Sequence, residues 1–227
     1  MTEPFIQIED LWFAYGDHPV LRELDFELNA GERVGLVGAN GSGKTTLLHL
    51  LVGLESPDRG TIGMFGRRRE SEADFREVRG RAGLLFQDPE DQLFCPTVRE
   101  DVAFGPLNLG HTPEEALEIV ADTLTGLGLE GYEDRITYKL SGGEKRLVSL
   151  ACVLAMEPDL LLLDEPSEGL DDEMRGRLVD ILRDLPQALL VVSHDRGFLR
   201  RVTDRAVRLL GGKTKPFDLS RPVSHAR

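Results

Sequence analysis

The feature that most constrains the fold is a glycine-rich loop that separates an apolar segment from an amphipathic one. It reads Gly38-Ala-Asn-Gly-Ser-Gly-Lys-Thr45 and follows the apolar run Arg33–Val37. Glycines let backbone N–H groups approach a phosphate closely, and the start of a following helix adds the positive end of its dipole. The spacing is that of a P-loop, which joins a buried strand to a helix. The sequence therefore predicts an α/β fold with a mostly parallel core sheet and a nucleoside triphosphate at one edge of that sheet.

The P-loop assigns a chemical task to each of its polar groups. Backbone N–H groups of residues 40–46 are expected to surround the β-phosphate, while the Lys44 amine reaches the β- and γ-phosphates. The Thr45 hydroxyl is placed to bind Mg²⁺. The residues that we assign to the nucleotide in this loop are Gly38, Asn40, Gly41, Ser42, Gly43, Lys44, Thr45 and Thr46. A glycine-rich turn without a ligand is the alternative, and the order of strand, loop and helix argues against it.

Two acidic residues end a second apolar segment. Leu160–Leu163 is an unbroken apolar run, as expected of a parallel strand buried on both faces, and Asp164 and Glu165 follow it. Ligands of open α/β sheets bind at the carboxyl ends of such strands, so we expect Asp164 to hold Mg²⁺. Glu165 lies one residue further, points elsewhere and can polarise an attacking water. The alternative is a strand that ends in two solvated acids.

A third motif follows the P-loop at a long interval, where the chain reads Leu140-Ser-Gly-Gly-Glu144. Ser141 and Glu144 have the spacing of a capping box, in which each side chain accepts a hydrogen bond from the other residue's backbone N–H. Gly142 and Gly143 leave this helix start open to an anion. An ordinary capped helix is the alternative. Beside a P-loop, however, the motif calls for a second phosphate, which a two-fold dimer supplies because each P-loop then faces the partner's motif.

These three motifs resemble those of ATP-binding-cassette (ABC) ATPases, and the resemblance extends over nearly the whole chain. It implies the P-loop NTPase fold of that family, with a flanking antiparallel β-subdomain and an inserted helical subdomain. It also implies ATP and Mg²⁺ held between two head-to-tail copies, with Ser141 and Gly143 of one copy against the γ-phosphate bound by the other. Glu165 would then be the general base for hydrolysis.

The resemblance assigns roles to three more side chains. His194 ends the next apolar strand and would contact the γ-phosphate; the alternative is a bystander beside a helix start that Ser193 or Asp195 caps. Gln87 would contribute its amide oxygen to Mg²⁺ and water while its loop senses a partner protein; the alternative is a turn residue. Tyr15 would stack on the adenine; the alternative is local packing on an edge strand.

Two positions depart from the common pattern of the family. Glu144 stands where glutamine is commonest, and it keeps the capping geometry. Ser167-Glu168 stands where threonine and a small residue are common. Neither change removes a group that hydrolysis needs, so we expect a competent site. Asp171, at the end of the same loop, is expected to cap the next helix.

The segment after the glutamine narrows the type of cassette. Phe86–Phe94 and Thr97–Gly110 resemble the ATPase subunits of energy-coupling-factor transporters, closest to the cobalt/nickel type. That resemblance implies an importer whose integral membrane subunit docks near Gln87–Gly110, on the cytoplasmic face of the plasma membrane. Leu93 and Phe94 would form an apolar floor for that contact, and core packing is the alternative. A vitamin importer and a soluble ABC ATPase that acts on DNA, ribosomes or cluster assembly remain open.

Composition limits the possible partners. The chain has a formal net charge of -13, which argues against nucleic acid and against electrostatic attachment to an anionic membrane. Arg67-Arg68-Arg69 is the one short basic run, and we interpret it as a solvated surface. Cys95 and Cys152 are expected to be free thiols, and no metal-ligand spacing links the histidines and cysteines. Neither a membrane-spanning segment nor a signal peptide is expected.

The segments predict one ABC ATPase domain over residues 1–212. Residues 1–87 and 158–212 form the nucleotide-binding core with the β-subdomain, and 88–157 form the helical subdomain. Residues 213–227 are expected to be a short, loosely ordered tail. The predicted strands include Phe5–Ile8 and Leu11–Tyr15 at the start of the chain. The predicted helices include Glu72–Arg79, Thr97–Phe104, Pro113–Leu127 and Asp171–Leu185.

Overall fold

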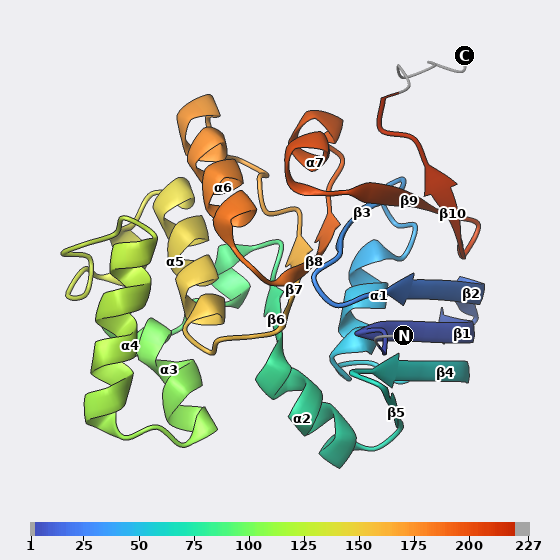
Figure 1. Ribbon diagram of the computed structural model, residues 1–227, viewed down its shortest axis with the longest axis horizontal. Helices are drawn as coiled ribbons and strands as arrows, with labels where there is room; N and C mark the ends of the chain where they lie inside the picture. Colours follow the sequence, from blue (N-terminus) through green and yellow to red (C-terminus); the bar gives the residue numbers. More distant parts are fainter. Residues whose placement is uncertain (1–2, 221–227) are drawn as a thin grey trace.

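The computed structural model describes residues 3–220, which form two sheets and a group of helices (Figure 1). The strands are β1 (Ile6–Tyr15), β2 (His18–Leu28), β3 (Arg33–Val37), β4 (Arg59–Met64), β5 (Arg67–Arg69), β6 (Ala82–Leu85), β7 (Leu160–Asp164), β8 (Ala188–Val192), β9 (Arg205–Leu210) and β10 (Lys213–Phe217). The helices are α1 (Lys44–Leu51), α2 (Glu72–Arg81), α3 (Val98–Leu109), α4 (Pro113–Gly126), α5 (Gly142–Leu154), α6 (Asp172–Asp184) and α7 (Arg196–Val202), with 3-10 turns η1 (Pro89–Asp91) and η2 (Thr137–Lys139).

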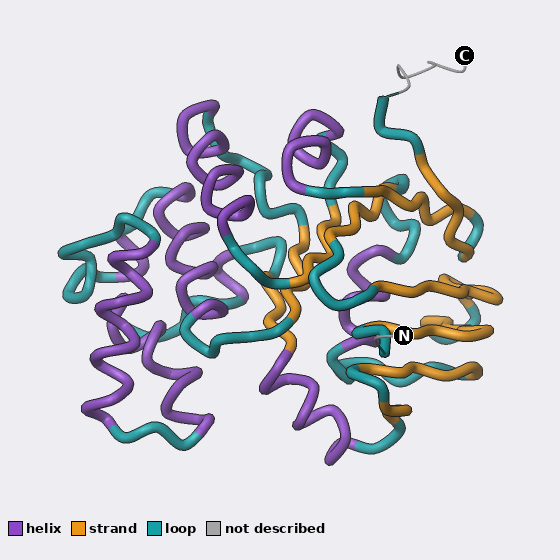
Figure 2. Tube along the Cα trace, viewed as in Figure 1, coloured by secondary structure: helices purple, strands orange, loops and turns teal. Residues whose placement is uncertain are grey.

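The strands divide into a mostly parallel core sheet and an antiparallel sheet, as Figure 2 shows. The core sheet has the order β10-β9-β3-β8-β7-β6, in which only the β10–β9 pair is antiparallel. The second sheet has the order β2-β1-β4-β5 and is antiparallel throughout. Helices α3, α4 and α5 lie together beyond β6. The predicted fold class is confirmed, including the antiparallel subdomain and the helical region.

Strand order brings the predicted motifs to one edge of the core sheet. The P-loop strand β3 pairs with β8, and β8 pairs with β7, all in parallel. Their carboxyl ends, at Val37, Val192 and Asp164, therefore lie side by side. Each strand is buried on both faces: Leu161 and Leu163 pack against the helices, while Leu160 and Leu162 pack toward α1 and the antiparallel sheet. This double burial explains why the strands read as unbroken apolar runs.

Capping boxes fix where several helices begin. Helices α2, α3, α4 and α5 each start with a serine or threonine whose side chain accepts from the N3 backbone N–H, while the N3 carboxylate accepts from the cap N–H. Helix α3 is longer than the predicted Thr97–Phe104, because Pro106 is tolerated inside it and Gly110 ends it with a φ of 100°. A left-handed glycine is a common end of a helix.

Two predictions about the ends of the chain are wrong. Phe5–Ile8 and Leu11–Tyr15 are not separate strands: β1 runs through both, and a bulge next to Asp10, which has a φ of 47°, absorbs the polar interruption. The first part of the predicted loose tail is ordered, since Lys213–Phe217 pairs with β9 along its length. Residues 221–227 of that tail lie outside the described residues.

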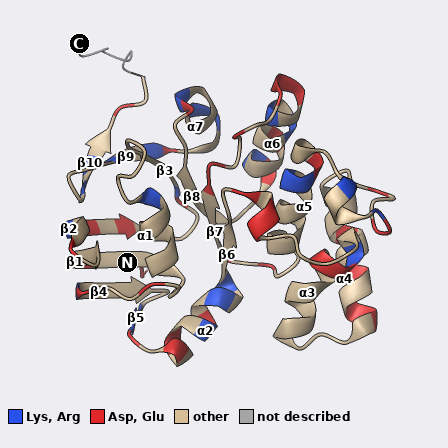
Figure 3. Cartoon of the chain, turned by 180° about the vertical axis from the view of Figure 1, so that it is seen from behind, with Lys and Arg blue, Asp and Glu red and all other residues tan. Residues whose placement is uncertain are grey.

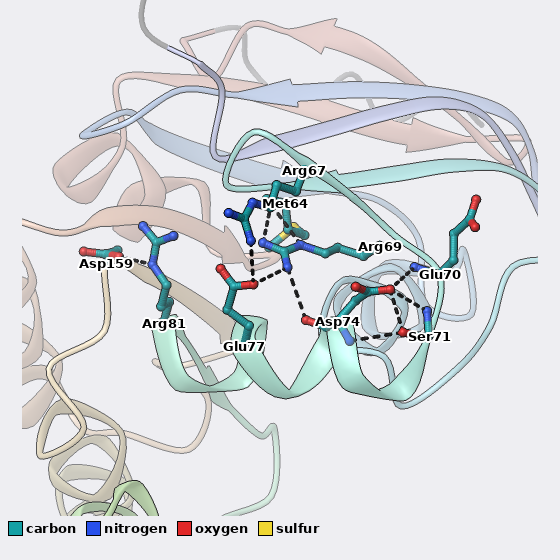
Figure 4. A network of polar contacts seen from close by, with 9 residues as sticks. All are labelled: Met64, Arg67, Arg69, Glu70, Ser71, Asp74, Glu77, Arg81 and Asp159. Carbon is teal, nitrogen blue, oxygen red and sulfur yellow. Dashed lines mark hydrogen bonds and ion pairs between the residues drawn. The ribbon is translucent and has the colours of Figure 1, made fainter.

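The prediction that the basic run Arg67–Arg69 is a solvated surface is wrong for its last residue. Arg69 is only 4% exposed, and its guanidinium lies between the Met64 carbonyl of β4 and residues of α2. Its Nε and Nη2 donate to the Met64 carbonyl at 3.1 and 3.0 Å, and its Nη1 lies 2.7 Å from a Glu77 carboxylate oxygen (Figure 4). Arg67 and Arg68 are exposed, as expected. Arg69 thus joins α2 to the antiparallel sheet.

Charged residues are unevenly distributed among the helices (Figure 3). Helix α4 carries only acidic charged residues and α7 carries only basic ones. Among residues 3–220, no helix combines the length and the apolar character that crossing a bilayer requires. The prediction that both cysteines are free thiols is confirmed.

Candidate functional site

The P-loop backbone takes a shape that only glycine can adopt without strain. Gly43 caps α1 with a φ of 100°, and a Cβ there would lie 2.6 Å from Val20. A Cβ on Gly38 would lie 2.6 Å from the Ser42 hydroxyl oxygen and 3.0 Å from the Leu209 carbonyl. The loop is therefore packed tightly on β9 and β2 and leaves its N–H groups facing outward at the start of α1.

Lys44 lies along this loop. Its side chain is largely buried, and its Nζ donates to the carbonyls of Gly38 and Ala39, both at 3.2 Å. The amine is therefore held by two neutral acceptors that an anionic phosphate can replace with a stronger, charge-assisted interaction. Ser42, in the same loop, has a buried hydroxyl oxygen without a partner among the described residues, so this loop also contains an unused donor.

The predicted Mg²⁺ ligands Thr45 and Asp164 lie in contact. The Thr45 hydroxyl donates to the Asp164 carboxylate at 2.5 Å, although 119 residues separate them along the chain. Burial raises the pKa of Asp164, and the hydroxyl of Thr45 partly offsets this rise. A buried carboxylate beside a hydroxyl is the oxygen-rich set that Mg²⁺ prefers, and a divalent cation would relieve the cost of burying the charge. The residues present therefore fit this ion.

Glu165 and His194 also lie together. The His194 Nδ1 is 3.0 Å from a Glu165 carboxylate oxygen, and the His194 backbone N–H donates to the same oxygen at 3.2 Å. Since an ionised carboxylate only accepts, Nδ1 carries the proton in this contact. Glu165 has a φ of 44°, which is unusual for a residue with a Cβ. The predicted base and histidine thus form one unit.

The helix cap predicted as an alternative for the histidine is also present. The Asp195 carboxylate accepts from the Phe198 N–H at 3.0 Å and caps α7. Capping and the contact to Glu165 are compatible, because adjacent residues make them. Likewise, Asp171 caps α6 by accepting from the Met174 N–H, as predicted.

Two pockets border this group of residues. One, of about 550 Å³, is lined by residues that include Thr45, Gln87, Asp164 and Glu168. The other, of about 570 Å³, borders the first part of the P-loop. Gly38, Ser42 and His194 are among the residues that line it. The structure therefore brings the predicted P-loop, acidic, glutamine and histidine residues to one region at the carboxyl edge of the sheet.

The remaining predicted nucleotide contacts lie apart from that region. Ser141 caps α5 by accepting from the Glu144 N–H at 3.3 Å, and the Glu144 carboxylate accepts from the Ser141 N–H at 2.8 Å, so the predicted capping box is confirmed. Nothing lies within 4 Å of a Cβ added to Gly142, whereas one on Gly143 would contact Met174. No hydrogen bond or ion pair within residues 3–220 joins this helix start to the P-loop.

Further contacts hold the start of α5 in place. The Glu144 carboxylate also accepts from the Tyr132 hydroxyl at 2.8 Å and from Arg135 at 2.9 Å. Together with the backbone hydrogen bond from Ser141, which is the largest cause, these partners hold the pKa of Glu144 below its ordinary value. The helix start is therefore rigid before any ligand arrives.

Tyr15 has an exposed ring at the end of β1. The ring packs edge to face against Phe13, with centroids 4.8 Å apart, and 47% of the residue is exposed. The predicted alternative of local packing is thus present on one edge of the ring. Its remaining surface is open to an adenine, and that role stays a prediction.

The predicted apolar floor after Gln87 is half correct. Phe94 is 66% exposed and packs edge to face on Phe104, but Leu93 is buried in the core of the helical region. Exposed Leu107, three residues after Phe104, extends this apolar surface along α3. Sequence alone could not separate the two neighbours, because a loop residue has no periodicity to indicate which side faces inward.

Asp101 connects this surface to η2, the turn that precedes α5. The sequence did not suggest this role. The residue is 3% exposed. Its carboxylate accepts from the N–H groups of Phe94 and Cys95 at 3.1 and 2.9 Å and from the Thr137 hydroxyl at 3.2 Å. Thr137 lies in η2, just before the Leu140–Glu144 motif. The only sequence signal at Asp101 is its place in the first turn of a helix. That place predicts an exposed side chain rather than a buried one.

Comparison with known proteins identifies the family. The ABC transporter family matches residues 21–168 of this chain. An ABC transporter ATP-binding protein of Brucella suis biovar 1 is 51% identical over 219 residues, which cover 96% of this chain and 91% of that protein. The energy-coupling factor transporter ATP-binding protein EcfA of Methanothermobacter thermautotrophicus is 41% identical over 213 residues, which cover 92% of this chain and 68% of that protein.

A solved structure agrees with these matches. The structure of cbiO1 from Clostridium perfringens, part of the ABC transporter complex cbiONQ, superposes with a TM-score of 0.83 at 31% sequence identity and covers 94% of this chain and 87% of that one. The P-loop, the acidic strand end and the capped glycine pair therefore stand in the fold that the motifs predicted. The chain belongs to the ABC transporter family and is an ATP-binding subunit that hydrolyses ATP to drive transport.

Proposed function

We propose that two copies of this chain close head to tail around two MgATP molecules and drive an importer of the energy-coupling-factor class. The observation that carries the proposal is the start of α5. Its capping box is complete and braced by Tyr132 and Arg135, and Gly142 leaves the helix end unobstructed. A rigid, open helix N-terminus is suited to an anion, and the P-loop of the same chain already has its own helix start in α1. The γ-phosphate of a partner's ATP satisfies both requirements.

Each residue predicted to contact MgATP has a proposed part in binding. The backbone N–H groups of residues 40–46 and the Lys44 amine bind the β- and γ-phosphates, and Tyr15 stacks on the adenine. Thr45, Asp164 and Gln87 hold Mg²⁺, which neutralises charge on the phosphates when bound. Ser141 and Gly143 come from the other copy. In support, Thr45 and Asp164 are already in contact, and Gln87 lines the same pocket.

Hydrolysis then needs one proton transfer. Glu165 accepts a proton from the attacking water as the water oxygen bonds to the γ-phosphorus, and the bond to ADP breaks. His194 fixes the carboxylate through its Nδ1 and its backbone N–H, both of which bind one oxygen and leave the other for water. Placing the base in this way typically contributes about 10²- to 10⁴-fold in rate.

The importer assignment rests on the surface after Gln87. Phe94, Phe104 and Leu107 form an exposed apolar surface on and beside α3 that a membrane subunit could cover. The sequence resemblance of this segment supports an energy-coupling-factor ATPase of the cobalt/nickel type. The names of the two relatives, EcfA and a component of cbiONQ, favour the same class. The proposed location is therefore the cytoplasmic face of the plasma membrane, and the proposed cargo is Ni²⁺ or Co²⁺ bound by a separate membrane subunit.

The dimer and the cargo need separate experiments. With ATP and Mg²⁺, the Glu165→Gln variant should elute as a dimer on size exclusion with light scattering; a persistent monomer would count against the sandwich. For the cargo, the chain should be co-purified with its membrane partners, and its ATPase rate measured with Ni²⁺, with Co²⁺ and with vitamins. Stimulation by a vitamin would reassign the cargo, and failure to retain any membrane protein would favour a soluble ABC ATPase.

A further inference from the structure

Gln87 is fastened at its backbone by the helix that carries the glycine pair. Arg146 in α5 is only 4% exposed, and its Nη1 donates to the Phe86 carbonyl at 2.7 Å while its Nη2 donates to the Gln87 carbonyl. Guanidinium donors in a fixed fork suit two adjacent carbonyls. The position of the Gln87 main chain is thus set by α5.

Neighbouring side chains extend this attachment along the loop. Lys145 forms an ion pair with Glu90. Gln92 donates to the Ser149 carbonyl at 3.1 Å and accepts from the Phe86 N–H at 3.3 Å. The loop from Phe86 to Gln92 is therefore bound to α5 by several independent contacts. These contacts should therefore keep the loop in place when a contact outside this set, such as one made by the Gln87 side chain, is lost.

The side chain of Gln87 is held from a different direction. Its Nε2 donates to the Glu168 carboxylate at 2.8 Å, between residues 81 positions apart in sequence. A carboxylate accepts only, so this contact requires that the amide nitrogen face Glu168. The amide oxygen is then turned to the other side, and within the described residues it accepts no hydrogen bond. Thr45, Asp164 and Gln87 line the same pocket as Glu168.

Glu168 is itself well placed to orient the amide. Its backbone N–H donates to the Glu165 carbonyl at 3.0 Å, which closes a tight turn directly after β7. Gly169 follows with a φ of 74°. The buried guanidinium of Arg146, which also donates to the Gln87 carbonyl, interacts electrostatically with Glu168.

We propose that Glu168 is a positioning residue that holds the Gln87 amide so that its oxygen faces Thr45 and Asp164, where MgATP binds. The proposal rests on the proposed role of Gln87. Glu168 does not touch the reacting atoms. Its effect is to remove the orientations of the amide in which the nitrogen would face the cation, and so to lower the cost of forming the closed site.

The first test compares variants at position 168. Glu168→Ala should lower kcat about tenfold, the usual scale for losing one hydrogen bond of this type, and leave the KM for ATP nearly unchanged. Glu168→Gln should stay within about twofold of the native rate, because its amide oxygen still accepts from Gln87. Glu130→Ala is the matched control, since it removes the same charge from an exposed loop position that makes no hydrogen bond or ion pair with the described residues.

A binding measurement separates positioning from folding. The Kd of a non-hydrolysable ATP analogue is measured in Mg²⁺ and in EDTA, and thermal unfolding is recorded for each variant. Glu168→Ala should reduce the preference for Mg²⁺ about tenfold, with the Kd in EDTA and the unfolding midpoint unchanged. Wild-type kcat and wild-type Mg²⁺ preference in Glu168→Ala would overturn the proposal, as would a Glu168→Gln variant as impaired as the alanine variant.

A double-mutant cycle distinguishes the positioning role of Glu168 from the proposed role of Gln87, on which it depends. In a Gln87→Ala background, Glu168→Ala should cause no further loss, because the side chain it positions is absent. Fully additive losses would refute the positioning role and leave the role of Gln87 intact. If Gln87→Ala alone kept the native rate and the native Mg²⁺ preference, the assignment of Gln87 would fail instead.

Discussion

Asp101 gives a quantitative test of how the helical region is held together. The carboxylate is 3% exposed and accepts three hydrogen bonds, from the backbone of Phe94 and Cys95 and from the Thr137 hydroxyl. Asp101→Ala leaves three donors without a partner: the buried Thr137 hydroxyl and the partly buried N–H groups of Phe94 and Cys95. Each such loss costs about 1–3 kcal/mol, partly relieved by water, so we expect a total of about 3–5 kcal/mol. Total stability is about 5–15 kcal/mol for a typical domain, so the loss is large.

Asp101→Asn is the matched comparison. Its single oxygen can still accept from the two backbone N–H groups, and its amide can donate to Thr137, so we expect a loss of only about 1 kcal/mol. Urea unfolding followed by circular dichroism measures both variants, with an unchanged m-value as the sign that only stability differs. An alanine variant within about 1 kcal/mol of the native protein would refute the hydrogen-bond account.

The same variants change a nearby thiol. Burial, followed by the charge of Asp101, raises the pKa of Cys95 to about 11. The reactive thiolate is therefore scarce at neutral pH, and alkylation of Cys95 should be slow. Both Asp101→Asn and Asp101→Ala remove the negative charge, so both should speed alkylation under native conditions. Equal rates in all three proteins, measured by intact mass, would contradict the electrostatic reasoning.

Two further predictions concern the nucleotide and the α5 cap. Tyr15→Ala should raise the KM for ATP about tenfold with little change in kcat, because base stacking contributes about 1–3 kcal/mol, whereas Tyr15→Phe should behave as native; equal KM values would remove Tyr15 from the site. The pKa of Glu144 is lowered by its hydrogen bonds, so its stabilising contribution is present above its ordinary pKa and is lost as pH falls through the folded pKa. Unfolding curves from pH 6 to 3 should therefore show a shallower acid loss in Glu144→Gln, and parallel curves would contradict this.

Much of the fold follows from signals that are local in sequence. The P-loop, the apolar run before Asp164 and the capping box at Ser141 each specify an element and one of its ends within a few residues. Parallel pairing then brings the ends of β3, β7 and β8 together without further information. For this reason the fold class and the grouping of Thr45 with Asp164 could be predicted.

Other features depend on contacts between distant segments. The burial of Arg69 requires α2 to pack across β5, and nothing in three consecutive arginines indicates which one faces inward. Strand β10 exists because β9 offers an unpaired edge, although its own sequence contains Pro216. The contact between Gln87 and Glu168 joins two loops that no local pattern relates. These features needed the three-dimensional arrangement.

The central claim is that each nucleotide site combines the P-loop of one copy with the α5 start of another. Lys44→Ala disables the first part, and Ser141→Arg blocks the second. Each variant alone should be inactive, but a one-to-one mixture should recover ATPase activity, to about a quarter of the native rate, because half of the dimers then contain one intact site. A mixture no more active than the separate variants would mean that both parts act within one chain, and would contradict the two-copy site.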